Sequence, residues 1–302
     1  MGCSGEKTQD GKKAIIYSNP VCRMTIELTK EYYSVTSIDD EKLVLGGREI
    51  IDLYDPLTKS ISTILKGHNG RINCMIKLSN GNLASGGQDG IIKVWDLKKM
   101  VELFSLKGHK SIIWDIREIA DNKLISGSDD NKSKIWDLKK KKEILELCGS
   151  HRQISSIAVL KNNKVVLASG KHIFLYNLKT KNNENCMDIK NTQIWAVKEL
   201  ANGDVAVGLG NGGLYTVKVT DELAIKTKFI YGHKKTINYI IELDNHKMVT
   251  SSDENDMVLW EPNEPDSMNI IKGHTDMVTC ICFIRGTKFV SISKDNTLKF
   301  WE

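Results

Sequence analysis

A repeated spacing of four side chains constrains the fold of this chain more than any other feature of its sequence. Trp95, Trp136, Trp260 and Trp301 each follow a histidine by 27 positions, a serine or threonine by 10 and a carboxylate by 6. A Gly-His pair contains each of these histidines. Four residue types held at fixed separations in four places indicate one structural unit that is copied along the chain.

Weaker copies of the unit fill the gaps between these four. Tyr54, Tyr176 and Val217 occupy the tryptophan place, so seven anchor positions stand 41, 41, 40, 41, 43 and 41 residues apart. A period of this length predicts a repeat architecture in which each unit packs against its neighbours.

Within a unit the sequence favours short strands. Segments 72–78, 82–85 and 91–95 are rich in β-forming residues, and Asn-Gly or Asp-Gly turn signals separate them. Helical spacing is absent from these segments. One such sheet cannot bury both of its faces alone, whereas a closed ring of sheets stacks them face on face.

The motif resembles that of the WD-repeat family, whose signature is a Gly-His pair followed by Trp-Asp within a unit of about 40 to 45 residues. The resemblance implies an all-β fold over residues 19–302, a seven-bladed β-propeller of four-stranded antiparallel blades. Trp301 ends the third strand of its unit, so the last blade needs a fourth strand. Shifting segment 59–65 back by one repeat leads to residues 19–26, and we expect this N-terminal strand to close the ring. Residues 1–18 are expected to form a flexible tail.

The four-residue sets look at first like catalytic Ser-His-Asp groups, but an enzyme needs one site and the set recurs. The resemblance implies instead a hydrogen-bonded chain from the indole through the hydroxyl and the histidine to the carboxylate, which satisfies several buried polar groups together. Arg48, Gly170 and Asn211 replace the acid in the other three units, which should be softer. The sets, called structural tetrads below, are His68, Ser85, Asp89 and Trp95; His109, Ser126, Asp130 and Trp136; His233, Thr250, Glu254 and Trp260; and His274, Ser291, Asp295 and Trp301.

Other signals of chemistry are weak. The glycine-rich stretch 208–213 partly resembles a dinucleotide-binding loop, but no helix follows it and it is typical of a hairpin turn. The seven cysteines contain no CxxC pair, and Cys280 and Cys282 alternate within a predicted strand, where they should pack in the core. The sequence therefore predicts no cofactor, no metal site and no enzymatic activity.

The resemblance also indicates where partners bind. WD-repeat propellers usually use their narrower face, formed by the loop before each first strand and the loop between the second and third strands. Trp114 and Trp195 lie outside the anchor positions and, with Arg71, are the predicted anchors for a partner protein. The alternative is that both indoles simply pack between blades. The full candidate set is Arg71, Trp114, Asp129, Trp195, Asn238, Met277 and Lys294.

Positive charge gathers in the predicted connections between third and fourth strands, on the opposite face. These connections contain Lys59, Lys98, Lys99, Lys139–Lys142, Lys179 and Lys181. Gly2 and Cys3 match sites for myristoylation and palmitoylation, although Glu6 stands where the pattern wants serine or threonine. Acyl groups beside the Lys139–Lys142 face would hold the chain on an anionic membrane surface. The alternative is an ordinary solvated lysine face.

We therefore expect a non-enzymatic scaffold that binds other proteins, either in the cytoplasm or tethered to a membrane. Residues 1–13 lack the apolar core of a signal peptide, which favours an intracellular location. One alternative is a substrate receptor of a cullin-type ubiquitin ligase, because Trp-Asp-Leu-Lys at Trp95 and Trp136 loosely resembles a docking box. Another is an RNA- or chromatin-associated propeller. Nucleic acid is disfavoured because aromatic residues do not alternate with the lysines.

Overall fold

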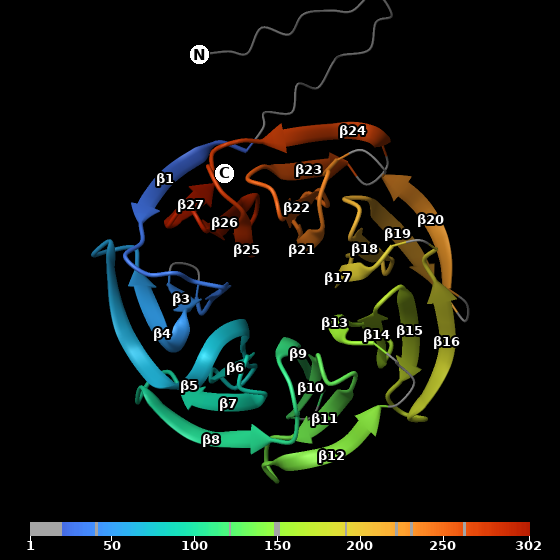
Figure 1. The fold of residues 1–302 in the computed structure, drawn as a ribbon, viewed down its shortest axis with the longest axis horizontal. Coiled ribbons are helices and arrows are strands. Elements are labelled where there is room, and N and C mark those ends of the chain that lie inside the picture. The colour runs from blue at the N-terminus through green and yellow to red at the C-terminus, as the bar shows by residue number, and fades with distance from the viewer. Residues whose placement is uncertain are drawn as a thin grey trace, which may run out of the picture.

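The structure is a ring of small β-sheets around a central axis (Figure 1). The computed structural model describes residues 20–39, 42–120, 122–147, 152–190, 192–220, 223–229, 232–261 and 264–302. Within these ranges every regular element is a strand, and no helix is long and apolar enough to cross a membrane. The prediction of an all-β propeller is confirmed.

The described strands form seven blades, numbered here in chain order. Blade 1 contains β2 (Ser34–Ser37), β3 (Leu43–Gly46), β4 (Arg48–Asp55) and the first part of β5 (Ser60–Lys77). Blade 2 contains the second part of β5 with β6 (Leu83–Gly87), β7 (Ile91–Asp96) and β8 (Val101–Lys107). Blade 3 contains β9 (Ile113–Ile119), β10 (Lys123–Ser128), β11 (Ser133–Asp137) and β12 (Lys142–Leu147).

The remaining blades repeat this antiparallel order. Blade 4 contains β13 (Ile154–Val159), β14 (Lys164–Ser169), β15 (His172–Asn177) and β16 (Asn182–Asp188). Blade 5 contains β17 (Ile194–Glu199), β18 (Val205–Leu209), β19 (Leu214–Val219) and β20 (Leu223–Phe229). Blade 6 contains β21 (Ile237–Glu242), β22 (Met248–Ser252), β23 (Met257–Glu261) and β24 (Glu264–Ile271). Blade 7 contains β25 (Val278–Arg285), β26 (Lys288–Ser293), β27 (Thr297–Trp301) and β1 (Cys22–Glu27).

The N-terminal strand closes the ring as predicted. β1 runs antiparallel to β27, with Met24 opposite Phe300 and Glu27 opposite Thr297 (Figure 1). The strand begins at Cys22, three positions after the start predicted from the repeat. The Thr279 hydroxyl of blade 7 adds a link to blade 1, since it donates to the Tyr32 carbonyl at 3.2 Å. The last blade is thus completed by residues from the other end of the sequence.

Antiparallel pairing divides the turns of every blade between two faces of the ring. The loops before first strands and the turns between second and third strands share one face, which we call the mouth face. The turns between first and second strands and between third and fourth strands share the other, which we call the lysine face. Because β1 starts beside Trp301, the chain enters blade 7 from the lysine face.

The core lies between blades, and the anchor tryptophans join them. Trp136 of blade 3 packs in one apolar cluster with Leu106 of blade 2, and Trp260 of blade 6 packs with Leu214 of blade 5. The indoles also explain the glycine of the Gly-His pair. A Cβ at Gly232 would lie 2.0 Å from the Trp260 ring, so a side chain there would collide with it.

Candidate functional site

Each structural tetrad forms one continuous hydrogen-bonded chain. In blade 3 the Trp136 Nε1–H donates to the Ser126 hydroxyl at 2.8 Å, and this hydroxyl lies 2.7 Å from His109 Nε2. His109 Nδ1 lies 2.8 Å from an Asp130 carboxylate oxygen. Asp130 also accepts the backbone N–H of Lys110 at 2.9 Å, which fixes the loop that precedes the first strand.

The other three tetrads repeat this geometry with small differences. The hydroxyl-to-His Nε2 distance is 2.7 Å at His68, 2.8 Å at His233 and 2.6 Å at His274. The His Nδ1-to-carboxylate distance is 2.8 Å at His68 and His274 but 3.3 Å at His233, where Glu254 replaces aspartate. Glu254 therefore keeps the interaction with the histidine, but at a longer distance than aspartate does.

If the histidine is neutral, each hydrogen-bonding group in a tetrad has a partner of the right kind. The hydroxyl accepts from the indole and donates to Nε2, and Nδ1–H donates to the carboxylate. Burial lowers the pKa of His109, His233 and His274, although the carboxylate partner opposes that shift. Ser126 is fully buried. Its oxygen is thus engaged on both sides and out of reach of a substrate.

Blade 1 uses a different set of polar contacts. Asp52, fully buried on β4, accepts the Tyr32 hydroxyl at 2.5 Å and pairs with Lys30 Nζ at 2.9 Å. Burial, helped by this hydrogen bond, raises the pKa of Tyr32. The 41-residue pattern did not reveal this set, because none of the three residues occupies a tetrad position. The signal for it was an acid within a run of apolar strand residues.

A cavity of about 830 Å³ occupies the centre of the ring, lined by the first strands of the blades. Six of the seven residues predicted to bind partners line it, although they come from five different blades. They are Arg71, Trp114, Trp195, Asn238, Met277 and Lys294. Asp129 is exposed on the β10–β11 turn and is not among the lining residues. The structure thus brings together side chains that lie up to 223 positions apart.

Trp114 and Trp195 contact each other across blade 4. Their ring centroids are 6.5 Å apart and the rings meet edge to face at 89°. Both side chains are half-buried, and in the described part of the chain the apolar clusters between blades contain neither of them. The Trp114 Nε1–H is buried and has no acceptor among the described residues. The pair lines the cavity and lies outside the apolar clusters that join neighbouring blades.

Arg71 and its neighbours complete the mouth of the cavity. The Arg71 guanidinium lies over the Tyr33 ring, 4.7 Å from its centroid. Tyr33 was not predicted; it lies just before β2 in the unit anchored by Tyr54, which lacks a Gly-His pair. Asn238 donates from Nδ2 to Asp253 at 2.8 Å, which orients this amide. The mouth therefore offers aromatic rings, a stacked guanidinium and a fixed amide.

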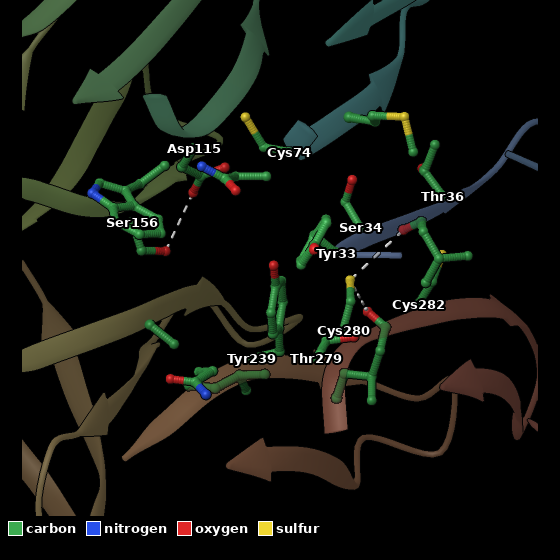
Figure 2. A pocket seen from close by; sticks show the side chains of 18 of the residues that line it. Tyr33, Ser34, Thr36, Cys74, Asp115, Ser156, Tyr239, Thr279, Cys280 and Cys282 are labelled. Atoms are coloured by element: carbon green, nitrogen blue, oxygen red, sulfur yellow. Dashed lines mark hydrogen bonds between the residues drawn. The ribbon is translucent and has the colours of Figure 1, made fainter. Parts of the chain in front are cut away.

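Cysteine thiols lie deeper in the cavity (Figure 2). Cys74, Tyr239 and Cys280 line this part of the cavity from different strands. Burial raises the pKa of Cys74 well above its usual value, that of Cys280 to about 12 and that of Cys282 to about 11. The thiols are therefore protonated at neutral pH and are poor nucleophiles and metal ligands. No group of metal-ligating side chains occurs among the described residues.

The lysine face carries the predicted charge. Lys139–Lys142 are exposed in the β11–β12 turn and at the start of β12, and the Asp137 carboxylate accepts the backbone N–H groups of Lys139 and Lys140. Asp96 caps the equivalent turn of blade 2 in the same way. The Trp-Asp-Leu-Lys segments thus have buried indoles and carboxylates engaged in their own turns. Gly2 and Cys3 lie outside the described residues.

Two family models match the chain. One, described as the WDR41 β-propeller, matches residues 49–262, and one described as WD domain, G-beta repeat, matches residues 266–302. The WD40 β-propeller domain of Doa1 superimposes with a TM-score of 0.83 over 95% of this chain and 97% of its own, at 19% identity. At that identity the likeness concerns the fold alone.

Curated relatives match shorter segments. THO complex subunit 6 homolog of Danio rerio is 29% identical over 93 residues, which are 30% of this chain and 29% of the relative. A p21-activated protein kinase-interacting protein 1-like of Xenopus laevis is 39% identical over 67 residues, 22% of this chain and 18% of the relative. Human WD repeat-containing protein 37 is 35% identical over 74 residues, 24% of this chain and 15% of the relative. The matches span less than a third of each of these relatives.

Proposed function

Because the chain belongs to the WDR41 β-propeller family, we propose that it is a scaffold that binds partner proteins and has no enzymatic activity of its own. The tetrad groups that resemble catalytic residues are buried and fully engaged with one another. One relative is named as a kinase-interacting protein, which is consistent with this class of function. The partner-binding surface in this proposal is the mouth of the central cavity.

The observation that carries the proposal is the Trp114–Trp195 pair. Tryptophan and arginine dominate the binding energy of protein interfaces when a partner desolvates them. Here two half-buried indoles and the Arg71 guanidinium line one concave mouth.

The test is a double variant, Trp114→Ala with Trp195→Ala, in the full chain. Partners of the wild-type chain are captured and identified by quantitative mass spectrometry, and the affinity of each purified partner is then measured. We expect a loss of at least about thirtyfold, since truncating a hot-spot residue costs about 2 kcal/mol or more. A cooperative melt would show that the ring still folds.

A matched control removes exposed apolar surface elsewhere. Leu103 and Ile270 are 40% and 46% exposed on outer strands, so Leu103→Ala with Ile270→Ala should leave binding unchanged. Equal binding by the tryptophan variant and the control would exclude the mouth as the partner site. Recovery of a cullin adaptor, or of RNA, would instead support one of the alternative functions.

A membrane tether is the finer part of the proposal. The chain enters β1 from the lysine face, which also carries the exposed Lys139–Lys142 run. Acyl groups on Gly2 and Cys3 would therefore join the propeller on its positive side, and one acyl chain with a basic patch gives stable anchoring. Gly2→Ala should shift the protein from the membrane fraction to the soluble fraction. Unchanged partitioning would rule out the tether.

A further inference from the structure

A second cavity opens on the lysine face, at the opposite end of the blades from the mouth. It has a volume of about 660 Å³ and lies between blades 3 and 4. The ends of β9 and β13, the β12 edge strand and the β15–β16 turn surround it. We call it the interblade pocket. It shares no lining residue with the central cavity.

The inner wall of the interblade pocket is apolar. Its lining includes Ile119, Ile135, Leu145, Val159, Leu160 and Leu178. Most of these side chains belong to the cluster that joins blades 3 and 4, so they are held in place by packing. Ile144 extends this wall outward and is 41% exposed. A partner side chain inserted here would be stabilised by the removal of apolar surface from water.

The rim of the pocket is strongly positive. Five lysines line it, namely Lys123, Lys140, Lys161, Lys179 and Lys181, against the single carboxylate of Asp137. That carboxylate already accepts two backbone N–H groups of its own turn. Within the described ranges, Lys161, Lys179 and Lys181 are exposed and none of their ammonium groups forms an ion pair, although Glu199 accepts the backbone N–H of Lys161 at 3.0 Å.

The turn that carries two of these lysines is fixed before any partner arrives. The Asn177 side chain accepts the backbone N–H of Lys179 at 2.9 Å. Lys181 has a φ of 60°, a conformation that glycine or asparagine adopts at lower cost. Elsewhere in blade 4 a lysine is neutralised, since Lys164 pairs with Glu184 at 2.7 Å. Positive charge is thus concentrated at the rim.

We propose that the interblade pocket binds an acidic segment of a partner protein that inserts a large apolar side chain between blades 3 and 4. The lysine rim complements the acidic residues, and the apolar wall receives the inserted side chain. A flat bilayer could contact the exposed lysines of this face but would not fill the cavity between the two blades, whereas an inserted side chain would. This second site is independent of the mouth and would let the propeller hold two partners on opposite faces.

The probe is a short fluorescein-labelled peptide in which glutamates flank a leucine–phenylalanine pair, titrated with the full chain and followed by anisotropy. The pocket variant carries Lys161→Glu, Lys179→Glu and Lys181→Glu. The control variant carries Lys59→Glu, Lys98→Glu and Lys99→Glu, which reverse the same number of exposed lysines on the same face, in blades 1 and 2. We expect at least about tenfold weaker binding for the pocket variant and less than about threefold for the control, because salt screens charges beyond about 8 Å.

A peptide with serines in place of the apolar pair should also bind at least about tenfold more weakly. Equal losses for the two lysine variants, or equal binding of the serine peptide, would overturn the proposal. So would binding to phosphatidylserine vesicles by a chain that does not bind the peptide, which would assign the face to a membrane. The Trp114→Ala/Trp195→Ala variant should bind this peptide with wild-type affinity. The proposal for the pocket and the proposal for the mouth can therefore be refuted independently.

Discussion

Blades 3 and 5 differ in the residues at the tryptophan and serine positions of the tetrad, which share a hydrogen bond in blade 3 and are both valine in blade 5. Blade 3 joins Trp136, Ser126, His109 and Asp130 in a buried polar chain. In blade 5, Val217 takes the tryptophan place and Val207 the serine place, and both are fully buried in an apolar cluster shared with blade 4. Both blades keep four strands. A polar set can therefore be lost as a whole, because no buried partner is left without its hydrogen bond.

Blade 1 adds a third solution, in which Asp52 accepts the Tyr32 hydroxyl and pairs with Lys30. All three kinds of blade have the same strand pattern. The sequence-based expectation that blades without a tetrad are less stable therefore concerns the free energy of unfolding. We expect the blades with a tetrad to contribute more to the stability of the ring than the blades without one.

The largest expected effect comes from the anchor positions themselves. Trp136→Ala should lower the free energy of unfolding by about 3–5 kcal/mol, because it removes a large buried side chain and leaves a cavity. Val217→Ala in blade 5 should cost only about 1–2 kcal/mol. Urea denaturation of both variants measures the difference. Equal losses would show that the two anchor residues contribute equally to the free energy of unfolding.

A smaller effect is expected from exchanging the serine and valine of the two blades. Ser126→Val should cost about 2–3 kcal/mol, because the Trp136 Nε1–H and His109 Nε2 both lose their partner. Val207→Ser should cost about 1–2 kcal/mol by burying an unpaired hydroxyl. The control repeats Ser126→Val in a Trp136→Phe background, where the indole donor is already gone. If the cost of Ser126→Val is the same there, the hydrogen bond does not contribute.

The smallest expected effect is a pH dependence that belongs to the tetrad blades. Burial lowers the pKa of His109, His233 and His274, so below about pH 6.5 the unfolded chain takes up protons more readily than the folded one. Their contribution to stability is present above that pH and is lost as the pH falls. Hydrogen bonds outweigh burial at Asp130 and Asp295 and lower their pKa, which extends the loss below about pH 4.

Thermal melts between about pH 7 and about pH 5 measure this slope. His109→Gln should flatten it, and His246→Gln is the control, since His246 is exposed, pairs with Glu242 and lies outside the tetrads. A slope that both variants alter equally would contradict the assignment to the tetrads.

The sequence alone determined the repeat, the blade architecture and the tetrads, because each of these depends on spacings within one unit. It also identified the closing strand to within three residues, since the missing fourth strand had to come from one repeat before the first anchor. The candidate residues of the mouth could be named because they occupy equivalent positions in successive units.

Only the tertiary structure decided how those residues meet. The edge-to-face contact of Trp114 with Trp195 spans a whole blade, and the stacking of Arg71 on Tyr33 joins two others, so neither follows from a spacing within one unit. The interblade pocket was likewise invisible, because it depends on how tightly blades 3 and 4 pack. Spacing fixes which side chains share a face of a blade, but the gap between blades depends on the volumes of side chains from both.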